Sequence, residues 1–97
     1  MPPASRVFDI ALGHDSFPPT PVSAGSPDVK TESLPQARKD DPCLPHDSYS
    51  PSPSHDRTIS AGSSTVKVNS KPASRLGDAI DCGGLLCSGA GTVIIGG

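Results

Sequence analysis

Residues 61–78 read AGSSTVKVNSKPASRLGD, and this stretch decides the fold that we expect. Val66 and Val68 flank Lys67, which is the alternation typical of a half-buried β-strand. The next four residues, Asn69-Ser70-Lys71-Pro72, are types that favour turns. The stretch therefore predicts a strand, a tight turn and a returning strand.

Both halves of this stretch recur in the chain. AGSSTV returns as AGSPDV at 24–29 and as SGAGTV at 88–93, whereas PASRLGD returns as PASRVFD at 3–9 and, less faithfully, as PQARKDD at 35–41. In every copy of the second half an Asp lies three residues after the Arg. We expect these pairs to be structural, with contacts to a partner as the alternative role of the arginines. The pairs are Arg6 with Asp9, Arg38 with Asp41, and Arg75 with Asp78.

The third unit is divided between the two ends of the chain. Residues 92–97 stop where a turn and a returning strand should follow, and the missing strand is the one at 3–9. Three hairpins in a ring, the last one completed by both termini, account for this arrangement. The sequence thus predicts an all-β fold, a small cone of three β-hairpins with pseudo-threefold symmetry. A single domain is expected over 1–97, with repeat units at 15–46, 47–82 and 83–97, the last completed by 1–14.

The composition is poor in the side chains that build a hydrophobic core. Gly, Pro and Ser fill 37 of the 97 positions, whereas Leu, Ile, Val and Phe fill 19. So little apolar surface cannot offset the entropy of ordering the chain, and a domain of this size needs a further stabilising element. Three cysteines, Cys43, Cys82 and Cys87, are an odd number for a disulfide framework. A bound metal is therefore the stabilising element that we expect.

The three histidines and one cysteine occupy equivalent places in the repeat. His14 and His46 each lie eight residues after the arginine of their unit, and Cys82 lies seven after its own. His55 lies seven residues before the glycine of the next AGSSTV copy, as Cys82 does. Threefold folding would bring the four together, and three imidazoles with one thiolate suit a closed tetrahedral Zn²⁺ site. We expect one Zn²⁺ per chain, with Fe as the alternative ion, and about 10–16 kcal/mol of binding energy for folding.

The two remaining cysteines and the Pro-rich stretches have other interpretations. Cys43 competes with His46 for a place among the ligands, because the two have metal-ligand spacing by themselves. Cys87 lies in an expected strand and is predicted to be a small buried hydrophobic residue. The Pro-rich stretches at 17–21 and 48–54 are expected to be loops.

PASRLGD at 72–78 and PASR at 3–6 resemble the Pro-Ala-Ala-Arg motif of the PAAR-repeat proteins, with Ser in the third place. GSSTVKVN at 62–69 resembles the strand that precedes this motif in the family. The resemblance implies a small β cone that caps the trimeric β-helical spike of type VI secretion systems and contractile phage tails. It also implies a zinc near the vertex held by three His and one Cys. These roles match His14, His46, His55 and Cys82 in this chain.

The expected function is that of a structural tip that sharpens the spike of a contractile injection machine and aids membrane piercing. Its partner would be a trimeric β-helical spike protein, VgrG-like or the central spike of a phage, with one tip per trimer. The target-cell membrane would be met transiently. Residues 1–6 lack the apolar stretch of a secretory signal peptide, so synthesis in the bacterial cytoplasm is expected, with delivery outward on contraction as part of the secretion apparatus or virion tail.

The alternative function is a small zinc-stabilised binding module, or a metal-dependent hydrolase if one histidine is not a ligand. Enzymatic motifs are missing from the sequence, which contains no Gly-x-Ser-x-Gly nucleophile elbow. A zinc with four protein ligands leaves no position for an activated water. Eight Lys and Arg against ten Asp and Glu, with three aromatic residues, do not make a nucleic-acid-binding surface. We therefore expect neither enzymatic activity nor nucleic-acid binding.

Overall fold

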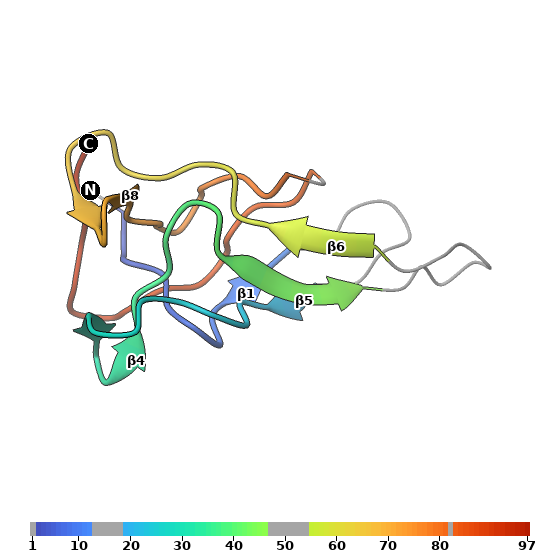
Figure 1. Ribbon diagram of the computed structural model, residues 1–97, viewed down its shortest axis with the longest axis horizontal. Helices are drawn as coiled ribbons and strands as arrows, with labels where there is room; N and C mark the ends of the chain where they lie inside the picture. Colours follow the sequence, from blue (N-terminus) through green and yellow to red (C-terminus); the bar gives the residue numbers. More distant parts are fainter. Residues whose placement is uncertain (1, 13–18, 47–54, 82) are drawn as a thin grey trace.

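The computed structural model describes residues 2–12, 19–46, 55–81 and 83–97 (Figure 1). Within these ranges the regular structure is entirely β, with no helix, which confirms the all-β part of the expected fold. The Cα radius of gyration, 12.7 Å, is close to the value of about 12.5 Å for a compact chain of this length. The strands form antiparallel pairs: β1 (Ile10–Ala11) with β2 (Thr20–Pro21), β3 (Lys30–Thr31) with β4 (Leu34–Pro35), β5 (Pro42–His46) with β6 (His55–Thr58), and β7 (Lys67–Val68) with β8 (Lys71–Pro72).

The hairpins β3–β4 and β7–β8 have the same two-residue turn. Both residues of Glu32-Ser33 have positive φ (49° and 69°), as do both residues of Asn69-Ser70 (53° and 68°). Two consecutive positive φ angles define a type I′ turn, whose twist matches that of the flanking strands. The strand, turn and strand predicted at 61–78 are therefore confirmed. The turn is shorter than expected, because Lys71 and Pro72 already belong to β8.

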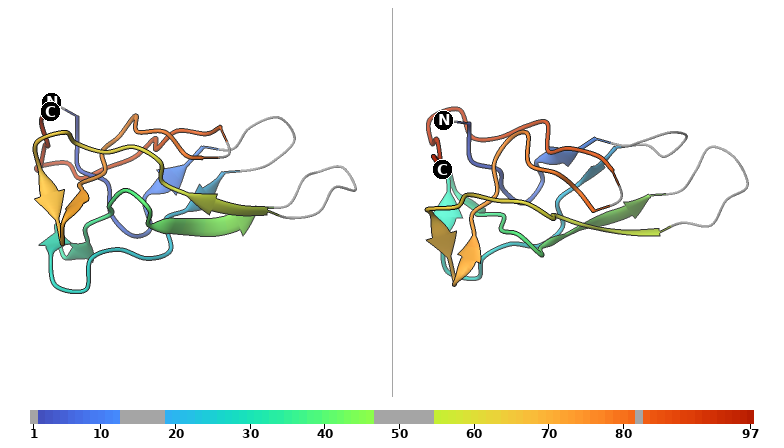
Figure 2. Two further views of the ribbon diagram at one scale, coloured as in Figure 1. Left: turned by 45° about the horizontal axis from the view of Figure 1, so that its top comes forward. Right: turned by 90° about the horizontal axis from the view of Figure 1, so that it is seen from above.

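The two ends of the chain lie side by side, as the divided third unit predicts (Figures 1 and 2). Pro3 and Ile94 form an antiparallel bridge. The amide of Ile95 donates a hydrogen bond to the carbonyl oxygen of Pro2 at 2.9 Å. The N-terminal segment therefore pairs with the C-terminal one.

The three repeated Arg–Asp pairs form the same turn and the same ion pair. In each, the Asp amide donates to the Arg carbonyl at 3.0–3.1 Å, and the Asp carboxylate accepts from the Arg amide at 2.7–2.8 Å. Guanidinium nitrogens lie 2.8–3.0 Å from the buried carboxylates. The hydrogen bond to the paired Asp is the largest cause that raises the pKa of each arginine above its usual value. The structural role predicted for these pairs is therefore confirmed.

Each of these arginines also makes a contact at the end of the molecule that carries the β3–β4 and β7–β8 turns and the chain termini, which we call the broad end. Their Nη1 atoms donate to the first residue of the Glu32-Ser33 turn, to the first residue of the Asn69-Ser70 turn, and to the backbone near the C-terminus. The contacts are Arg6 to Glu32 Oε1 at 3.0 Å, Arg38 to Asn69 Oδ1 at 3.1 Å, and Arg75 to the Gly96 carbonyl at 3.3 Å. In all three copies of the motif the arginine Nη1 therefore donates to an oxygen atom of another segment.

The core is small and built of short aliphatic side chains. It consists of two clusters of buried side chains. The first contains Val7, Ala11, Val22, Ala37, Cys43, Ile59, Ile80 and Leu86, and the second contains Ala4, Val68, Ala73 and Ile95. The sparse core agrees with the composition.

Two local expectations are wrong. Cys87 is exposed, because Leu86 takes the inward position and strand alternation turns its neighbour outward. The loop expected at 17–21 includes β2 at its end, where Pro21 pairs with Ile10. Pro21 can do so because it forms a non-hydrogen-bonded pair with Ile10, next to the bond from the Val22 amide to the Asp9 carbonyl at 2.9 Å, so the pairing needs no N–H from Pro21. Residues 17 and 18 and the expected loop at 48–54 lie outside the described residues.

Candidate metal centre

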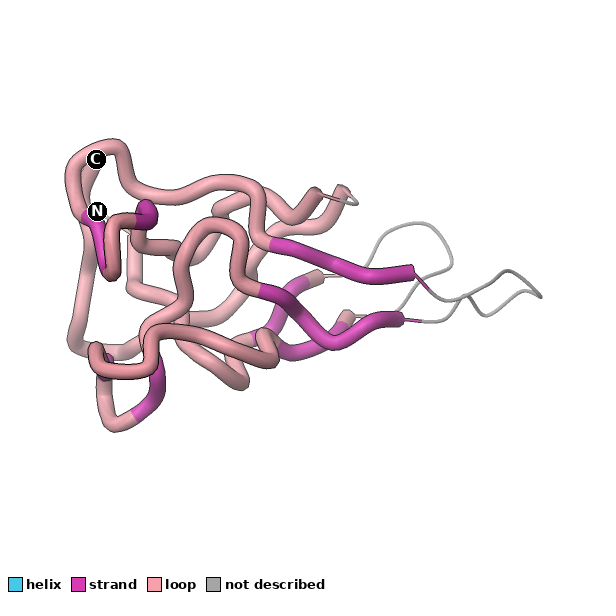
Figure 3. Tube along the Cα trace, in the orientation of Figure 1, coloured by secondary structure: helices cyan, strands magenta, loops and turns pink. Residues whose placement is uncertain are grey.

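The segments that flank the predicted metal ligands lie at one end of the molecule (Figures 1 and 3). The β5–β6 pair extends towards this end, and so do the β1–β2 pair and the residues 79–81 and 83–86. The turns of β3–β4 and β7–β8 lie at the opposite, broader end. The described segments next to the predicted ligands and these two turns thus lie at opposite ends of the molecule.

Two of the four predicted ligands are register partners. His46 at the end of β5 pairs with His55 at the start of β6, and a register shift separates this pair from Cys43↔Arg57. Cα atoms of antiparallel partners lie about 4.5–5.5 Å apart, a spacing that lets two imidazoles reach one ion. The structure therefore brings the backbones of these two histidines together.

The other two predicted ligands, His14 and Cys82, lie outside the described residues. The nearest described segments end at Leu12 before His14 and resume at Gly83 after Cys82, and these segments are joined by a backbone hydrogen bond. The amide of Leu12 donates to the carbonyl of Leu85 at 2.7 Å. The segment before His14 is therefore bonded to the segment after Cys82.

The segment around Cys82 is in turn bonded to β6. The amide of Asp81 donates to the carbonyl of Thr58 at 2.9 Å, and the amide of Ile80 donates to the carbonyl of Gly84 at 2.8 Å. The second bond joins the described residues on either side of Cys82. The backbone thus links the surroundings of all four predicted ligands.

A buried arginine that the sequence does not predict lies among these segments. Arg57 is 1% exposed, and its Nη1 donates to the carbonyl of Ala11 at 3.0 Å and to the hydroxyl of Thr20 at 2.8 Å. Its Nη2 donates to the carbonyl of Leu12. Arg57 lies outside the repeated motifs, so the repeat does not reveal it. The available signal was its alternation with the buried Ile59, which places both residues on one face of a strand.

Cys43, the alternative ligand, lies in the hydrophobic core. It is 3% exposed and belongs to the cluster that contains Val22 and Ile59. Among the described side chains no group of three or more His, Cys, Asp or Glu is placed to hold a metal. Three imidazoles and a thiolate remain a donor set that fits tetrahedral zinc, and the pairing of His46 with His55 is compatible with it.

At the broad end, serine hydroxyls close two copies of the loop before the first strand of a unit. Ser26 Oγ accepts from the amide of Val29 at 2.9 Å, and Ser63 Oγ accepts from the amide of Val66 at 2.9 Å. The third copy has Ala90 at the equivalent position, which offers no hydroxyl.

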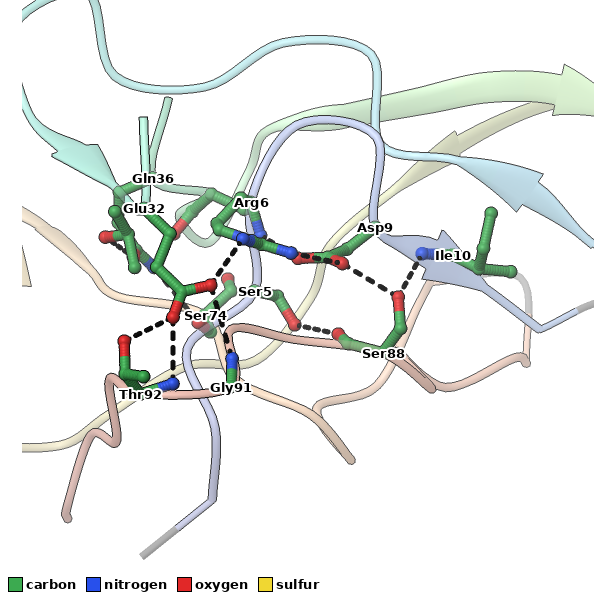
Figure 4. Close-up of polar contacts among 12 residues, drawn as sticks. Ser5, Arg6, Asp9, Ile10, Glu32, Gln36, Ser74, Ser88, Gly91 and Thr92 are labelled. Atoms are coloured by element: carbon green, nitrogen blue, oxygen red, sulfur yellow. Dashed lines mark hydrogen bonds and ion pairs between the residues drawn. The ribbon is translucent and has the colours of Figure 1, made fainter. Parts of the chain in front are cut away.

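In this third copy a carboxylate from another unit takes the place of the hydroxyl (Figure 4). Glu32 accepts from the amide of Thr92 at 2.8 Å, from the amide of Gly91 at 3.3 Å and from the Thr92 hydroxyl. Figure 4 shows Arg6 between Glu32 and its own partner, Asp9. The hydrogen bond from the Thr92 hydroxyl is the main cause that holds the pKa of Glu32 below its usual value.

A family model described as the PAAR motif matches residues 12–88. This range contains all four predicted ligands. No curated protein matches the chain. In the part of the chain that the structure describes, no helix is long and apolar enough to cross a membrane.

Proposed function

Because this chain belongs to the PAAR-motif family, we propose that it is the structural tip that caps a trimeric β-helical spike in a contractile injection machine. The observation that carries the proposal is the family match over residues 12–88. The machine would be a type VI secretion system or a contractile phage tail. The role is mechanical: the tip is carried outward on contraction and sharpens the spike where it meets the target-cell membrane.

The broad end is the surface that we assign to the spike. Three equivalent positions there carry Val29, Val66 and Val93, each followed by an exposed residue. The repeated links from Arg6, Arg38 and Arg75 support a pseudo-threefold base. Such a base can cover the open strand edges at the end of a trimeric β-helix.

The narrow end is the place that we assign to the zinc. His14, His46, His55 and Cys82 would hold it in a closed tetrahedral site. Coordination would stiffen an end where three chain segments meet and the hydrophobic core is sparse. The metal supplies rigidity in this proposal, and no residue of the chain is assigned a catalytic step.

Co-expression with the trimeric spike protein and native mass spectrometry test the proposal. We expect one copy of this chain per three spike subunits, since a single base would cover the whole end of the trimer. Failure to copurify, or three copies per trimer, would contradict it.

Charge reversal at the base sharpens this test. Lys30→Glu with Lys67→Glu alters two exposed residues that directly follow the base valines, and we expect at least a tenfold loss of spike affinity. Lys39→Glu, in the turn between Arg38 and Asp41, is the matched control and should bind like the wild type.

A further inference from the structure

We propose that Arg57 is the positioning residue of the metal centre. Its buried guanidinium joins the chain segments that carry the four predicted ligands. This inference rests on the proposed zinc site and deepens it, because it assigns a role to a residue outside the ligand set.

The first link is within β6 itself. Arg57 lies two residues after His55 in the same strand, which puts their Cα atoms about 6.6 Å apart along it. Arg57 is fully buried, so its position fixes how β6 enters the narrow end.

The second link is to the segment that leads to His14. Nη1 of Arg57 donates to the carbonyl of Ala11, and Nη2 donates to the carbonyl of Leu12. Two consecutive carbonyls are thus held by the two arms of one planar fork, which an ammonium group cannot reproduce. Leu12 lies two residues before His14.

The third link runs through a hydroxyl. Thr20 accepts from Arg57 Nη1 at 2.8 Å and donates to the carbonyl of Leu44 at 2.7 Å. Leu44 lies in β5, two residues before His46. Arg57 therefore acts on β5 by way of Thr20.

The fourth link is a close approach of the backbone. A Cβ atom at Gly84 would collide with the carbonyl oxygen of Leu12 and lie 2.7 Å from Arg57 Nη2. The chain therefore passes directly against the contact between Arg57 and Leu12. Gly84 lies two residues after Cys82.

All four links thus end two residues from a predicted ligand. An arginine buried only to fill space could be replaced by an apolar side chain, because removing a charge from water is costly. The fork of hydrogen bonds explains why a guanidinium stands here. It sets the relative positions of the ligand-bearing segments before the metal binds.

The test uses the full-length chain, stripped of metal and reloaded with Co²⁺, whose visible absorption reports the geometry of its ligands. We compare the wild type with Arg57→Met and with Arg57→Lys, which keeps the charge but loses the fork. Outer-shell changes typically cost 10–100-fold in metal affinity, and we expect a loss in this range for both variants, with shifted Co²⁺ bands.

Arg38→Met is the matched control. It removes an arginine that makes an ion pair with Asp41 at 2.8 Å, away from the narrow end. We expect a lower melting temperature with unchanged Co²⁺ bands and affinity. A merely structural Arg57 would give the same result as this control, and that outcome would overturn the inference.

Two further arms keep the outcomes distinct. If Arg57→Met does not fold, Thr20→Val removes the hydroxyl that joins Arg57 to Leu44 and leaves the other three links in place. For this variant we expect shifted Co²⁺ bands and a loss of Co²⁺ affinity of a few-fold. Unchanged bands in both Thr20→Val and Arg57→Lys would overturn the inference. A wild-type chain that binds neither Co²⁺ nor Zn²⁺ would overturn the metal site itself, whereas the spike-binding experiment tests the tip function separately.

Discussion

Single residues show where this chain accepts backbone strain. The turn between each repeated Arg and its Asp has positive φ at its third residue: 78° at Phe8, 77° at Asp40 and 93° at Gly77. Glycine adopts such angles freely, whereas a bulky side chain does so at a cost of about 1–2 kcal/mol. Phe8 is also 68% exposed, so its ring gains little from burial.

Phe8→Gly is therefore expected to stabilise the protein. Relief of strain should exceed the added entropy of the unfolded glycine, for a net gain of about 0.5–1 kcal/mol and a rise of several degrees in melting temperature. Thermal unfolding followed by circular dichroism measures it. Leu76→Gly is the control. Leu76 is the second residue of its turn and has no positive φ, so replacing it with Gly relieves no strain and should destabilise the protein. A destabilised Phe8→Gly would show that the ring makes contacts that matter.

At the scale of elements, the units are tied to one another by polar side chains. The hydroxyls of Ser26 and Ser63 each accept a hydrogen bond from an amide of their own loop. In the loop that contains Ala90, an amide donates instead to the Glu32 carboxylate of the β3–β4 turn. The C-terminal segment thus depends on a charge carried by another hairpin. This dependence makes its attachment sensitive to pH.

Acid should loosen the contact between β3–β4 and the C-terminal segment. Hydrogen bonds, first that of the Thr92 hydroxyl, hold the pKa of Glu32 below its usual value in the folded protein. A lowered folded pKa contributes stability that is complete above the unfolded pKa and is lost as pH falls through the folded pKa. Melting temperatures measured from pH 7 to pH 3 should fall more steeply for the wild type than for Glu32→Gln. Parallel curves would contradict the prediction.

At the scale of the whole molecule, the metal is expected to supply stability that the core cannot. We predict one Zn²⁺ per chain by elemental analysis. Removal of the zinc with a chelator should lower the melting temperature by more than about 10 °C. Because imidazole ligands must be deprotonated, zinc should be released as pH falls below the unperturbed His pKa of about 6.5.

Cysteine variants check this metal prediction. Cys82→Ser should lose most of its zinc, since it removes the single predicted thiolate ligand. Cys87→Ser alters an exposed thiol and should keep the wild-type metal content. Equal zinc contents in the two variants would rule out Cys82 as a ligand and return Cys43 to consideration.

The repeats by themselves determined the fold class, the β3–β4 and β7–β8 hairpins, the pairing of the chain ends and the three Arg–Asp pairs. These features depend on residues close together in a unit, or on the same few residues recurring. They can therefore be predicted from the sequence alone. The repeat phase also placed His46 and His55 at opposed strand ends, as their register pairing shows.

Only the tertiary structure decided which residues outside the repeats matter. Arg57 contacts Ala11, 46 positions away, and nothing near it in the sequence indicates that carbonyl. Cys87 faces outward because Leu86 pairs with Ala11 across a bridge, and Pro21 joins a strand because its non-hydrogen-bonded pairing with Ile10 needs no N–H. Each outcome depends on which backbone groups, distant in the sequence, become neighbours when the chain folds. Composition and residue spacing do not indicate which groups these are.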